Sequence, residues 1–235
     1  MAERERWSRK ERLEQQANRL ELLSRWADDL AHEIKNPLHA MVINLELVKR
    51  RAGGPDPAAL IERAEVVESE LQRVHELVDS LLRLVRPWGA AQTTSVDTVF
   101  NALLPVFTAR ARIRRVEYAH EGEPAIVAMR PGELAQVVLN LLDNALEATA
   151  GGGQLRTTVE RTDGGVVLTV ADTGPGLSGG VTPAVADPGS PTEGRSGLGL
   201  AVSTRLIERA GGTLRFESEV GGTRAIVALP GTGSA

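Results

Sequence analysis

The 235-residue sequence has no cysteine, no long apolar run and no large excess of either charge. The lack of cysteine excludes disulfides, thiolate catalysis and cysteine-ligated metal sites, and it fits a reducing cytosolic compartment. No apolar run approaches the roughly 18 to 20 residues that a helix needs to cross a bilayer, and the charged N-terminus has no apolar signal-peptide core. The formal net charge of -4 gives no reason to expect nucleic acid or an anionic membrane as a partner. We therefore expect a soluble cytoplasmic chain, or the cytosolic part of a membrane-bound sensor whose other segments precede Met1.

Apolar and small residues in the first part of the chain recur at alternating steps of four and three. This spacing is typical of the apolar seam of a helix in a bundle or coiled coil. Two seams are separated by the helix-breaking sequence Gly53-Gly54-Pro55-Asp56-Pro57, which predicts a helical hairpin. The first seam consists of Leu13, Ala17, Leu20, Ser24, Ala27, Ala31, Ile34, Leu38, Met41, Leu45 and Val48, and the second of Leu60, Ala64, Val67, Leu71, Val74, Val78, Leu81 and Val85.

A hairpin with an apolar seam on each helix cannot bury both seams well by itself. Two such chains can bury them together in a four-helix bundle. The pattern therefore predicts homodimerisation through residues 13–85. The sequence Arg86-Pro87-Trp88-Gly89 is typical of a helix end followed by a linker, so we assign residues 1–88 to the helical domain and residues 89–235 to a second domain.

Residues 89–235 mix helical and strand periodicity. A glycine- and proline-rich stretch from Gly174 to Ser196 is too polar and too broken to pack, and the tail 231–235 is predicted to be disordered. Helices over a mostly antiparallel sheet form a two-layer α/β sandwich, so the predicted fold class is α plus α/β. The predicted helices are residues 96–111, 132–150 and 198–210, and the predicted strands are residues 116–118, 125–129, 154–161, 166–171, 214–218 and 223–229.

His32 comes directly after a seam residue, so we expect it on a flank of the bundle that solvent or another domain can reach. Such a histidine can attack as a neutral imidazole. Glu33 is its neighbour and can fix the ring tautomer and accept the ring proton. Asn36 lies one turn further along the same face, and Pro37 removes a backbone hydrogen bond, which predicts a kink. Taken alone, His32 is more simply a solvated surface histidine, as is His39 one heptad later, which has no acidic residue after it.

Two asparagines, Asn140 and Asn144, lie four residues apart within the apolar stretch from Gln136 to Ala145. This spacing places both amides on one face of a helix. Buried amides need partners, because leaving them unsatisfied costs free energy. A carboxamide oxygen is also a suitable ligand for a Mg²⁺ ion that carries nucleotide phosphates. Helix-surface asparagines without any ligand are an equal alternative on this pattern alone.

Glycines flank two further candidate positions. Asp172 closes a strand just before Gly174 and Gly176, and its carboxylate can accept a hydrogen bond from an exocyclic amine such as that of adenine. The segment Gly197-Leu198-Gly199 opens a helix, where free backbone N–H groups and the helix dipole favour phosphate. Glycine turns are common, so each segment alone is weak support, and the P-loop pattern GxxxxGK[ST] is absent.

Together and in this order, these motifs resemble those of the two-component sensor histidine kinases over nearly the whole chain. Five motifs in one order at suitable spacing are not a chance combination, so the resemblance outweighs the alternatives that apply to each motif alone. The matching motifs are an H-box in His32-Glu33-x-x-Asn36-Pro37, an N-box in Asn140 to Ala145, glycine boxes at Asp172 to Gly176 and Ser196 to Leu200, and a last glycine motif at Gly221 to Thr223.

The resemblance implies a Bergerat-type ATP-binding domain, shared with Hsp90, DNA gyrase B and MutL. It implies that this domain is joined to a dimeric helical bundle, which bears the phosphoacceptor histidine and an N-terminal signalling helix. It also implies that Asn144 coordinates Mg²⁺, that Asp172 reads adenine, that the glycine-rich segment closes over the phosphates, and that Thr223 contributes to cofactor binding. Asn140 stands where the related ATPases have a catalytic glutamate, which agrees with a kinase that does not hydrolyse ATP. The expected cofactors are ATP and Mg²⁺, and the expected partners are a second copy of the chain and the receiver domain of a response regulator.

The sequence departs from the family pattern at two places. Kinases of this family often have an aromatic F-box before the second glycine box, but residues 177–196 contain no phenylalanine. We therefore expect a lid that packs loosely or orders only when nucleotide binds. Arg130 stands roughly where an acidic residue often precedes the N-box helix, and nothing in the sequence explains that change.

The predicted reaction is autophosphorylation of His32 with Glu33 as the base, followed by transfer to an aspartate of the response regulator. Asn36 is predicted to support dephosphorylation of that regulator by holding a water molecule, or else only to satisfy backbone groups freed by Pro37. The alternative functions are a dimeric scaffold with a nucleotide switch, an ATPase of the Hsp90 or gyrase type, and a serine kinase with the same pocket. The helical hairpin that carries His32 beside Glu33 argues against the two enzymes.

Overall fold

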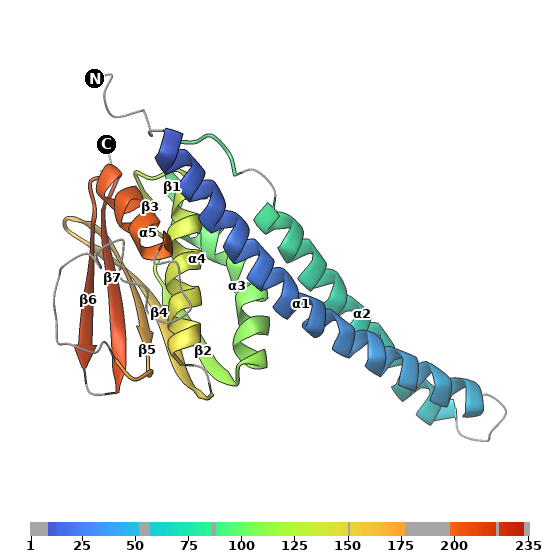
Figure 1. Cartoon of the computed structure of the whole chain (residues 1–235). Coiled ribbons are helices and arrows are strands. Elements are labelled where there is room, and N and C mark those ends of the chain that lie inside the picture. Colours follow the sequence, from blue (N-terminus) through green and yellow to red (C-terminus); the bar gives the residue numbers. More distant parts are fainter. Residues whose placement is uncertain are drawn as a thin grey trace.

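Two long helices, α1 (Arg9–Arg51) and α2 (Pro57–Val85), form a hairpin in the computed structural model of the chain (Figure 1). The structure describes residues 9–51, 57–85, 88–149, 151–176, 198–219 and 221–232. The helix break predicted at residues 53–57 agrees with the ends of the two helices, and α1 continues through Pro37 as one helix. None of the described helices is long and apolar enough to cross a membrane.

A five-stranded sheet forms one layer of the second half of the chain, with strand order β2-β4-β5-β7-β6 (Figure 1). Its first pair, β2 and β4, is parallel, and the other three pairs are antiparallel. The strands predicted at residues 154–161 and 166–171 are confirmed as β4 and β5, which pair antiparallel. The strands are β2 (Val116–Gly122), β4 (Gly153–Thr162), β5 (Gly165–Asp172), β6 (Thr213–Glu219) and β7 (Gly222–Pro230).

Three helices cover one face of this sheet: α3 (Val96–Ile113), α4 (Pro131–Ala148) and α5 (Leu198–Arg209) (Figure 1). α4 begins at Pro131, whose fixed φ suits the first turn and whose missing N–H needs no partner there. Most of α4 is buried, because it packs on the sheet, on α3 and on α5. The predicted α plus α/β fold, with a helical hairpin before a two-layer sandwich, is confirmed.

The structure corrects two details of the predicted strands. The strand expected at residues 125–129 is only β3 (Ile126–Val127), which pairs with an unpredicted two-residue strand, β1 (Thr94–Ser95). Gly231, which was expected in a disordered tail, instead forms an isolated bridge with Val127. Residues 233–235 lie outside the described residues. Both corrections concern pairs too short to show a period of two.

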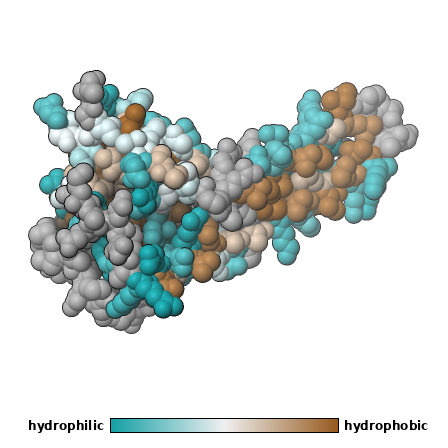
Figure 2. All heavy atoms as spheres, turned by 90° about the horizontal axis from the view of Figure 1, so that it is seen from above, coloured by the Kyte–Doolittle hydropathy of each residue, from teal (hydrophilic) through white to brown (hydrophobic). Residues whose placement is uncertain are grey.

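α1 has two different faces. Several seam residues of the hairpin, including Leu13 and Leu20, are exposed in the single chain, the latter by 68%. Leu22 and Trp26, which lie off the predicted seam, are buried instead, because the N-terminal half of α1 crosses the helices of the α/β domain. Figure 2 shows apolar side chains gathered along the arm of the hairpin that projects away from that domain. The exposed seam residues with large apolar side chains are Leu13, Leu20, Leu38, Leu45, Leu71 and Val78.

Candidate nucleotide-binding and phosphoacceptor site

The two asparagines of α4 are held in the helical layer with part of their polar surface unsatisfied. The Asn140 Nδ2 donates to the carbonyl oxygen of Gly199 and to Oγ of Ser203, each at 2.9 Å. Among the described residues, neither Oδ1 of Asn140 nor Nδ2 of Asn144 has a hydrogen-bond partner, although both atoms are buried. An unsatisfied buried polar atom costs about 1–3 kcal/mol. Two of them one helical turn apart therefore point to a polar ligand beside this face of α4.

The first turn of α5 packs directly against the first of these amides. A Cβ atom on Gly199 would lie 3.2 Å from Oδ1 of Asn140, so a larger residue here would press on the amide. Leu198 begins α5, and the N–H groups of a helix's first turn have no partner within the helix. An anion at this end of α5 would find free donors and a favourable dipole. Gly197, the other predicted phosphate-binding glycine, lies outside the described residues.

Asp172 ends β5 beside the C-terminal end of α4. Its Oδ1 accepts a hydrogen bond from the backbone N–H of Gly174 at 2.9 Å. Burial raises the pKa of the Asp172 carboxyl above 3.8, and backbone hydrogen bonds from Gly174 and Thr223 oppose that rise. Gly174 is required here, because a Cβ atom would lie 2.7 Å from the carbonyl oxygen of Ala148. Thr223 is the cross-strand partner of Asp172, so these three predicted positions lie together, and Gly176 follows with φ at +76°.

These residues fit a nucleotide in its magnesium complex. Asn140 contacts the start of α5, and Ala148, eight residues later in α4, lies beside Gly174 and Asp172. Along the axis of α4, the part of the site at α5 (the α5 end) is therefore about 12 Å from the part at Asp172 (the Asp172 end). The α5 end offers helix N–H groups and two unsatisfied amides, which suit phosphate oxygens and a hard cation. An amide can present its oxygen or its nitrogen to a ligand by turning over. The Asp172 end offers a half-buried carboxyl as acceptor. No group of three or more His, Asp and Glu side chains in the described ranges could hold a metal by itself. A cation here would therefore need the phosphate oxygens of the nucleotide among its ligands.

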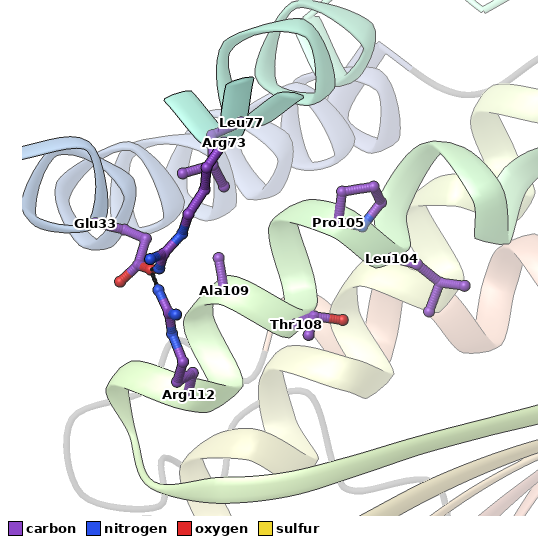
Figure 3. Close-up of a pocket in the computed structure, with 8 residues that line it drawn as sticks. All are labelled: Glu33, Arg73, Leu77, Leu104, Pro105, Thr108, Ala109 and Arg112. Carbon is purple, nitrogen blue, oxygen red and sulfur yellow. Dashed lines mark hydrogen bonds and ion pairs between the residues drawn. The ribbon is translucent and has the colours of Figure 1, made fainter. Parts of the chain in front are cut away.

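Glu33, the predicted base, is buried between three helices (Figure 3). Its carboxylate makes ion pairs with Arg73 of α2 and with Arg112 of α3, and its side chain is only 3% exposed. His32 lies in α1 one residue earlier, and its side chain lies outside the described part of the chain. Asn36 is exposed one turn further on. The structure thus places Glu33 against the α/β domain, where sequence reasoning had not expected its charge to be paired.

A second buried carboxylate, Asp143, connects α1 to α4. It lies between the two asparagines in sequence, and it accepts hydrogen bonds from Arg110 Nη1 at 2.6 Å and from Trp26 Nε1 at 3.0 Å. Arg25 Nη1 lies 3.1 Å from its other oxygen. The guanidinium of Arg110 stacks on the Trp26 ring at 4.6 Å and also binds Asp29. Sequence reasoning missed this cluster, although an aspartate inside the apolar stretch of α4 was a signal that a buried cation must face it.

Comparison with known proteins identifies both halves of the chain. Residues 22–87 match the His Kinase A (phospho-acceptor) domain. Residues 129–233 match the family of histidine kinase-, DNA gyrase B- and HSP90-like ATPases. The catalytic domain of histidine kinase ThkA superposes with a TM-score of 0.56 at 25% identity, covering 61% of this chain and 100% of that one.

Similarity to curated proteins extends over most of the chain. It is 29% identical over 227 residues to sporulation kinase D of Bacillus subtilis, covering 94% of this chain and 44% of that protein. It is 32% identical over 215 residues to the sensory histidine kinase/phosphatase NtrB of Klebsiella oxytoca, covering 86% of this chain and 60% of that protein. The chain spans about half the length of the curated relatives it matches.

The order of the two domains, the motifs within them and the fold agree. The chain is the catalytic core of a two-component sensor histidine kinase, in which a phospho-acceptor hairpin precedes an ATP-binding domain.

Proposed function

We propose that this chain phosphorylates its own His32 from ATP and passes the phosphoryl group to an aspartate on the receiver domain of a response regulator. The observation that carries the proposal is the pair of unsatisfied buried amide atoms on Asn140 and Asn144, beside the start of α5. Because the chain also has a phospho-acceptor hairpin, a nucleotide whose phosphates bind at that place can supply the phosphoryl group for the reaction. We assign residues 1–88 to the hairpin and residues 89–235 to the ATP-binding domain, and we expect both in the cytoplasm, where ATP is available.

In the proposed site, Asp172 accepts a hydrogen bond from the adenine amine, and Thr223 supports it from the neighbouring strand. Gly174 and Gly176 let the chain turn close to α4, and Leu198 and Gly199, with Gly197, present backbone N–H groups to the phosphates. Asn144 is the residue that would hold Mg²⁺, which neutralises phosphate charge when bound. Asn140 fixes the start of α5 and, unlike a glutamate, does not activate water.

The phosphoryl transfer then needs positioning more than covalent chemistry by the nucleotide pocket. A ring nitrogen of His32 attacks the γ-phosphorus, a new N–P bond forms, and the bond to the bridging oxygen breaks to release ADP. Glu33 accepts the proton from the imidazole ring. Reacting atoms must approach to about 3–3.5 Å in line, so the histidine and the nucleotide have to be brought together by the two domains.

The exposed seam supports homodimerisation through residues 13–85. Leu38, Leu45, Leu71 and Val78 are apolar and exposed on the arm of the single chain, and a second hairpin would bury them in a four-helix bundle. We propose that a response regulator docks on this bundle near His32. Asn36 is exposed there and is proposed to hold a water molecule for dephosphorylation of the regulator, an activity that the name of the similar NtrB also states.

The test of the proposed function is the chemical nature of the product. Incubation with γ-labelled ATP and Mg²⁺ should give a protein adduct that is stable in base and labile in acid, as a phosphoramidate is and a phosphoserine is not. His32→Gln should abolish the label and leave ATP binding intact, whereas His39→Gln should keep it. If His32→Gln kept the label and His39→Gln lost it, the phosphoacceptor would be His39 and the assignment of His32 would be wrong.

A further inference from the structure

Ser203 lies among apolar residues on the buried side of α5. It is 0% exposed, and its neighbours Val202, Leu206 and Ile207 are buried as well. α5 packs against α4 here, and Asn140 of α4 contacts Ser203 directly. A hydroxyl group in such surroundings costs free energy unless it is hydrogen-bonded, so its partners indicate why a serine stands at this position.

Ser203, Gly199 and Asn140 form a closed set of hydrogen bonds. The Asn140 Nδ2 donates to the Ser203 Oγ and to the carbonyl oxygen of Gly199, each at 2.9 Å. The Ser203 Oγ donates its own hydrogen to the same carbonyl oxygen, also at 2.9 Å. An amide nitrogen has two hydrogens and a hydroxyl has one, so these three bonds use every donor of the two side chains.

This arrangement fixes the direction in which the Asn140 amide faces. A backbone carbonyl can only accept a hydrogen bond, so the amide atom beside the Gly199 carbonyl must be the nitrogen. Turning the amide over would place Oδ1 against that carbonyl and would break both bonds that Nδ2 makes. Ser203 strengthens the preference, because its hydroxyl supplies the second acceptor for Nδ2.

The oxygen of the same amide faces the start of α5 without a partner. Asn140 is 2% exposed, and its Oδ1 has no hydrogen-bond partner among the described residues. This oxygen lies 3.2 Å from where a Cβ of Gly199 would be, at the end of α5 to which we assign the phosphates. A buried acceptor that is unsatisfied and held in one orientation suits a hydrogen-bond donor or a hard cation.

The two forms of ATP differ in what they offer to such an acceptor. The phosphate oxygens of metal-free ATP are negatively charged acceptors, so they repel an amide oxygen. Mg²⁺ carries positive charge and usually keeps several bound water molecules, which are donors. An Asn140 amide that was free to turn over would instead present its N–H groups to bare phosphate.

We propose that Ser203 determines the specificity of the nucleotide site for the magnesium complex of ATP over metal-free ATP, by holding the Asn140 amide with its oxygen toward the ligand. The inference rests on the proposed function, because it concerns the same nucleotide site. Ser203 is a positioning residue in this role, since it acts through Asn140. Its loss should therefore change the choice between the two forms of the nucleotide more than it changes the fold.

Calorimetry with and without Mg²⁺ measures this choice. The intact chain is titrated with ATP in Mg²⁺ and again in EDTA, and the magnesium preference is the Kd in EDTA divided by the Kd in Mg²⁺. Ser203→Ala should lower the magnesium preference by about 3- to 10-fold, the change that one hydrogen bond carries. A general loosening of the domain would weaken both affinities together and leave the preference unchanged.

A second variant tests the same position with little change in volume. Ser203→Cys replaces the hydroxyl by a thiol, which is a weak donor and a weak acceptor. It should also lower the magnesium preference, and it keeps the proposal testable if Ser203→Ala folds poorly.

Thr204→Ala is the matched control. Thr204 follows Ser203 in α5 and donates to the carbonyl oxygen of Leu200 at 2.9 Å, the same bond back along the helix that Ser203 makes to Gly199. Thr204 is only partly buried, and the described hydrogen bonds of the Asn140 amide go to Gly199 and Ser203. The magnesium preference of Thr204→Ala should equal that of the parent.

A double-mutant cycle shows whether Ser203 acts through Asn140. Asn140→Ala should itself have a low magnesium preference, and adding Ser203→Ala should change that value by less than about 2-fold. An unchanged preference in both Ser203 variants would overturn the proposal, as would an equal fall in Thr204→Ala or a full further fall in the Asn140→Ala background.

The parent protein separates this inference from the function on which it rests. Equal ATP affinities of the parent in Mg²⁺ and in EDTA would overturn the inference, and a parent that binds no ATP would overturn both. A parent that prefers the magnesium complex but forms no phosphohistidine would count against the proposed function alone.

Discussion

Replacement of Asp143 by alanine is expected to destabilise the protein strongly, because it leaves a buried cation with too few partners. Asp143 accepts hydrogen bonds from Trp26 and Arg110, and Arg25 contacts its second oxygen. The side chains of Asp143 and Arg110 are only 2% and 1% exposed. After the change, the guanidinium of Arg110 keeps its pair with Asp29 and its stacking on Trp26, but it loses its shortest contact.

The expected cost follows from this geometry. Breaking a buried ion pair by removing one partner costs about 3–5 kcal/mol, and the remaining contact with Asp29 places this case near the lower end. About 3 kcal/mol is a large part of the roughly 5–15 kcal/mol that stabilises a domain. With a urea m-value of about 2 kcal/mol/M, the unfolding midpoint should fall by roughly 1.5 M.

Urea unfolding followed by tryptophan fluorescence measures this shift, since Trp26 is part of the cluster and Trp88 packs on Gly132 at the start of α4. Glu147→Ala is the control: this carboxylate also binds Arg25, but it is one quarter exposed, so its loss should cost less than about 1 kcal/mol. The double variant Asp143→Leu with Arg110→Leu removes both charges and should be more stable than Asp143→Ala. A cost below about 1 kcal/mol for Asp143→Ala, or a double variant less stable than the single one, would refute the reasoning.

Four further predictions concern the site and its pH dependence. Glu33→Ala should slow labelling of His32 by roughly 10² to 10⁴, the usual contribution of a positioned base, and an unchanged rate in a quench-flow assay would leave Glu33 only a structural role. Asn144→Ala should weaken ATP binding in calorimetry with Mg²⁺ but much less with EDTA, whereas Asn101→Ala, on the exposed side of α3, should change neither. Asp172→Asn should reduce the preference for ATP over GTP, and equal ATP and GTP affinities in the parent would remove its proposed role. The same variant should slightly raise the free energy of unfolding at pH 7, because burial raises the pKa of the Asp172 carboxyl and its ionisation therefore costs stability above pH 3.8. Burial lowers the pKa of His120 below 6.5, so the folded state binds fewer protons than the unfolded state. The free energy of unfolding should therefore decrease as the pH falls below about 6.5. In His120→Gln this decrease should be smaller, and identical pH profiles of the variant and the parent would contradict the prediction.

The order of the secondary structure could be predicted from the sequence, because long periodic segments specify their own elements. The alternating steps from Leu13 to Val48 predict α1, and the apolar stretch around Asn140 predicts α4. Short pairs escaped prediction: β1 has only two residues, and it forms because Thr94 and Ser95 meet Ile126 and Val127 from a distant part of the chain. No local pattern of two residues can indicate such a pair.

Most residues of the candidate site could also be predicted from the sequence. Glycines whose Cβ would collide with the backbone, as at Gly174, and amides at helical spacing within an apolar stretch are visible as motifs. Their order along the chain carried the resemblance to the histidine kinases, because each motif constrains its own few residues. A motif does not reveal which side chains from other helices and strands pack against it.

The tertiary structure alone decided how the two domains meet. The heptad pattern predicts burial of Leu20 between two chains, and the single chain leaves it exposed while burying Leu22 and Trp26 against the α/β domain. A helix of 3.6 residues per turn can present two apolar faces at once, and its sequence does not state which partner covers each. Likewise, Glu33 next to His32 predicts a base, while its pairing with Arg112 depends on the packing of α1 across α3. The sequence determined which groups are available for the chemistry, and the packing of distant segments determined which of them are engaged, because that packing depends on the shape and charge of both surfaces together.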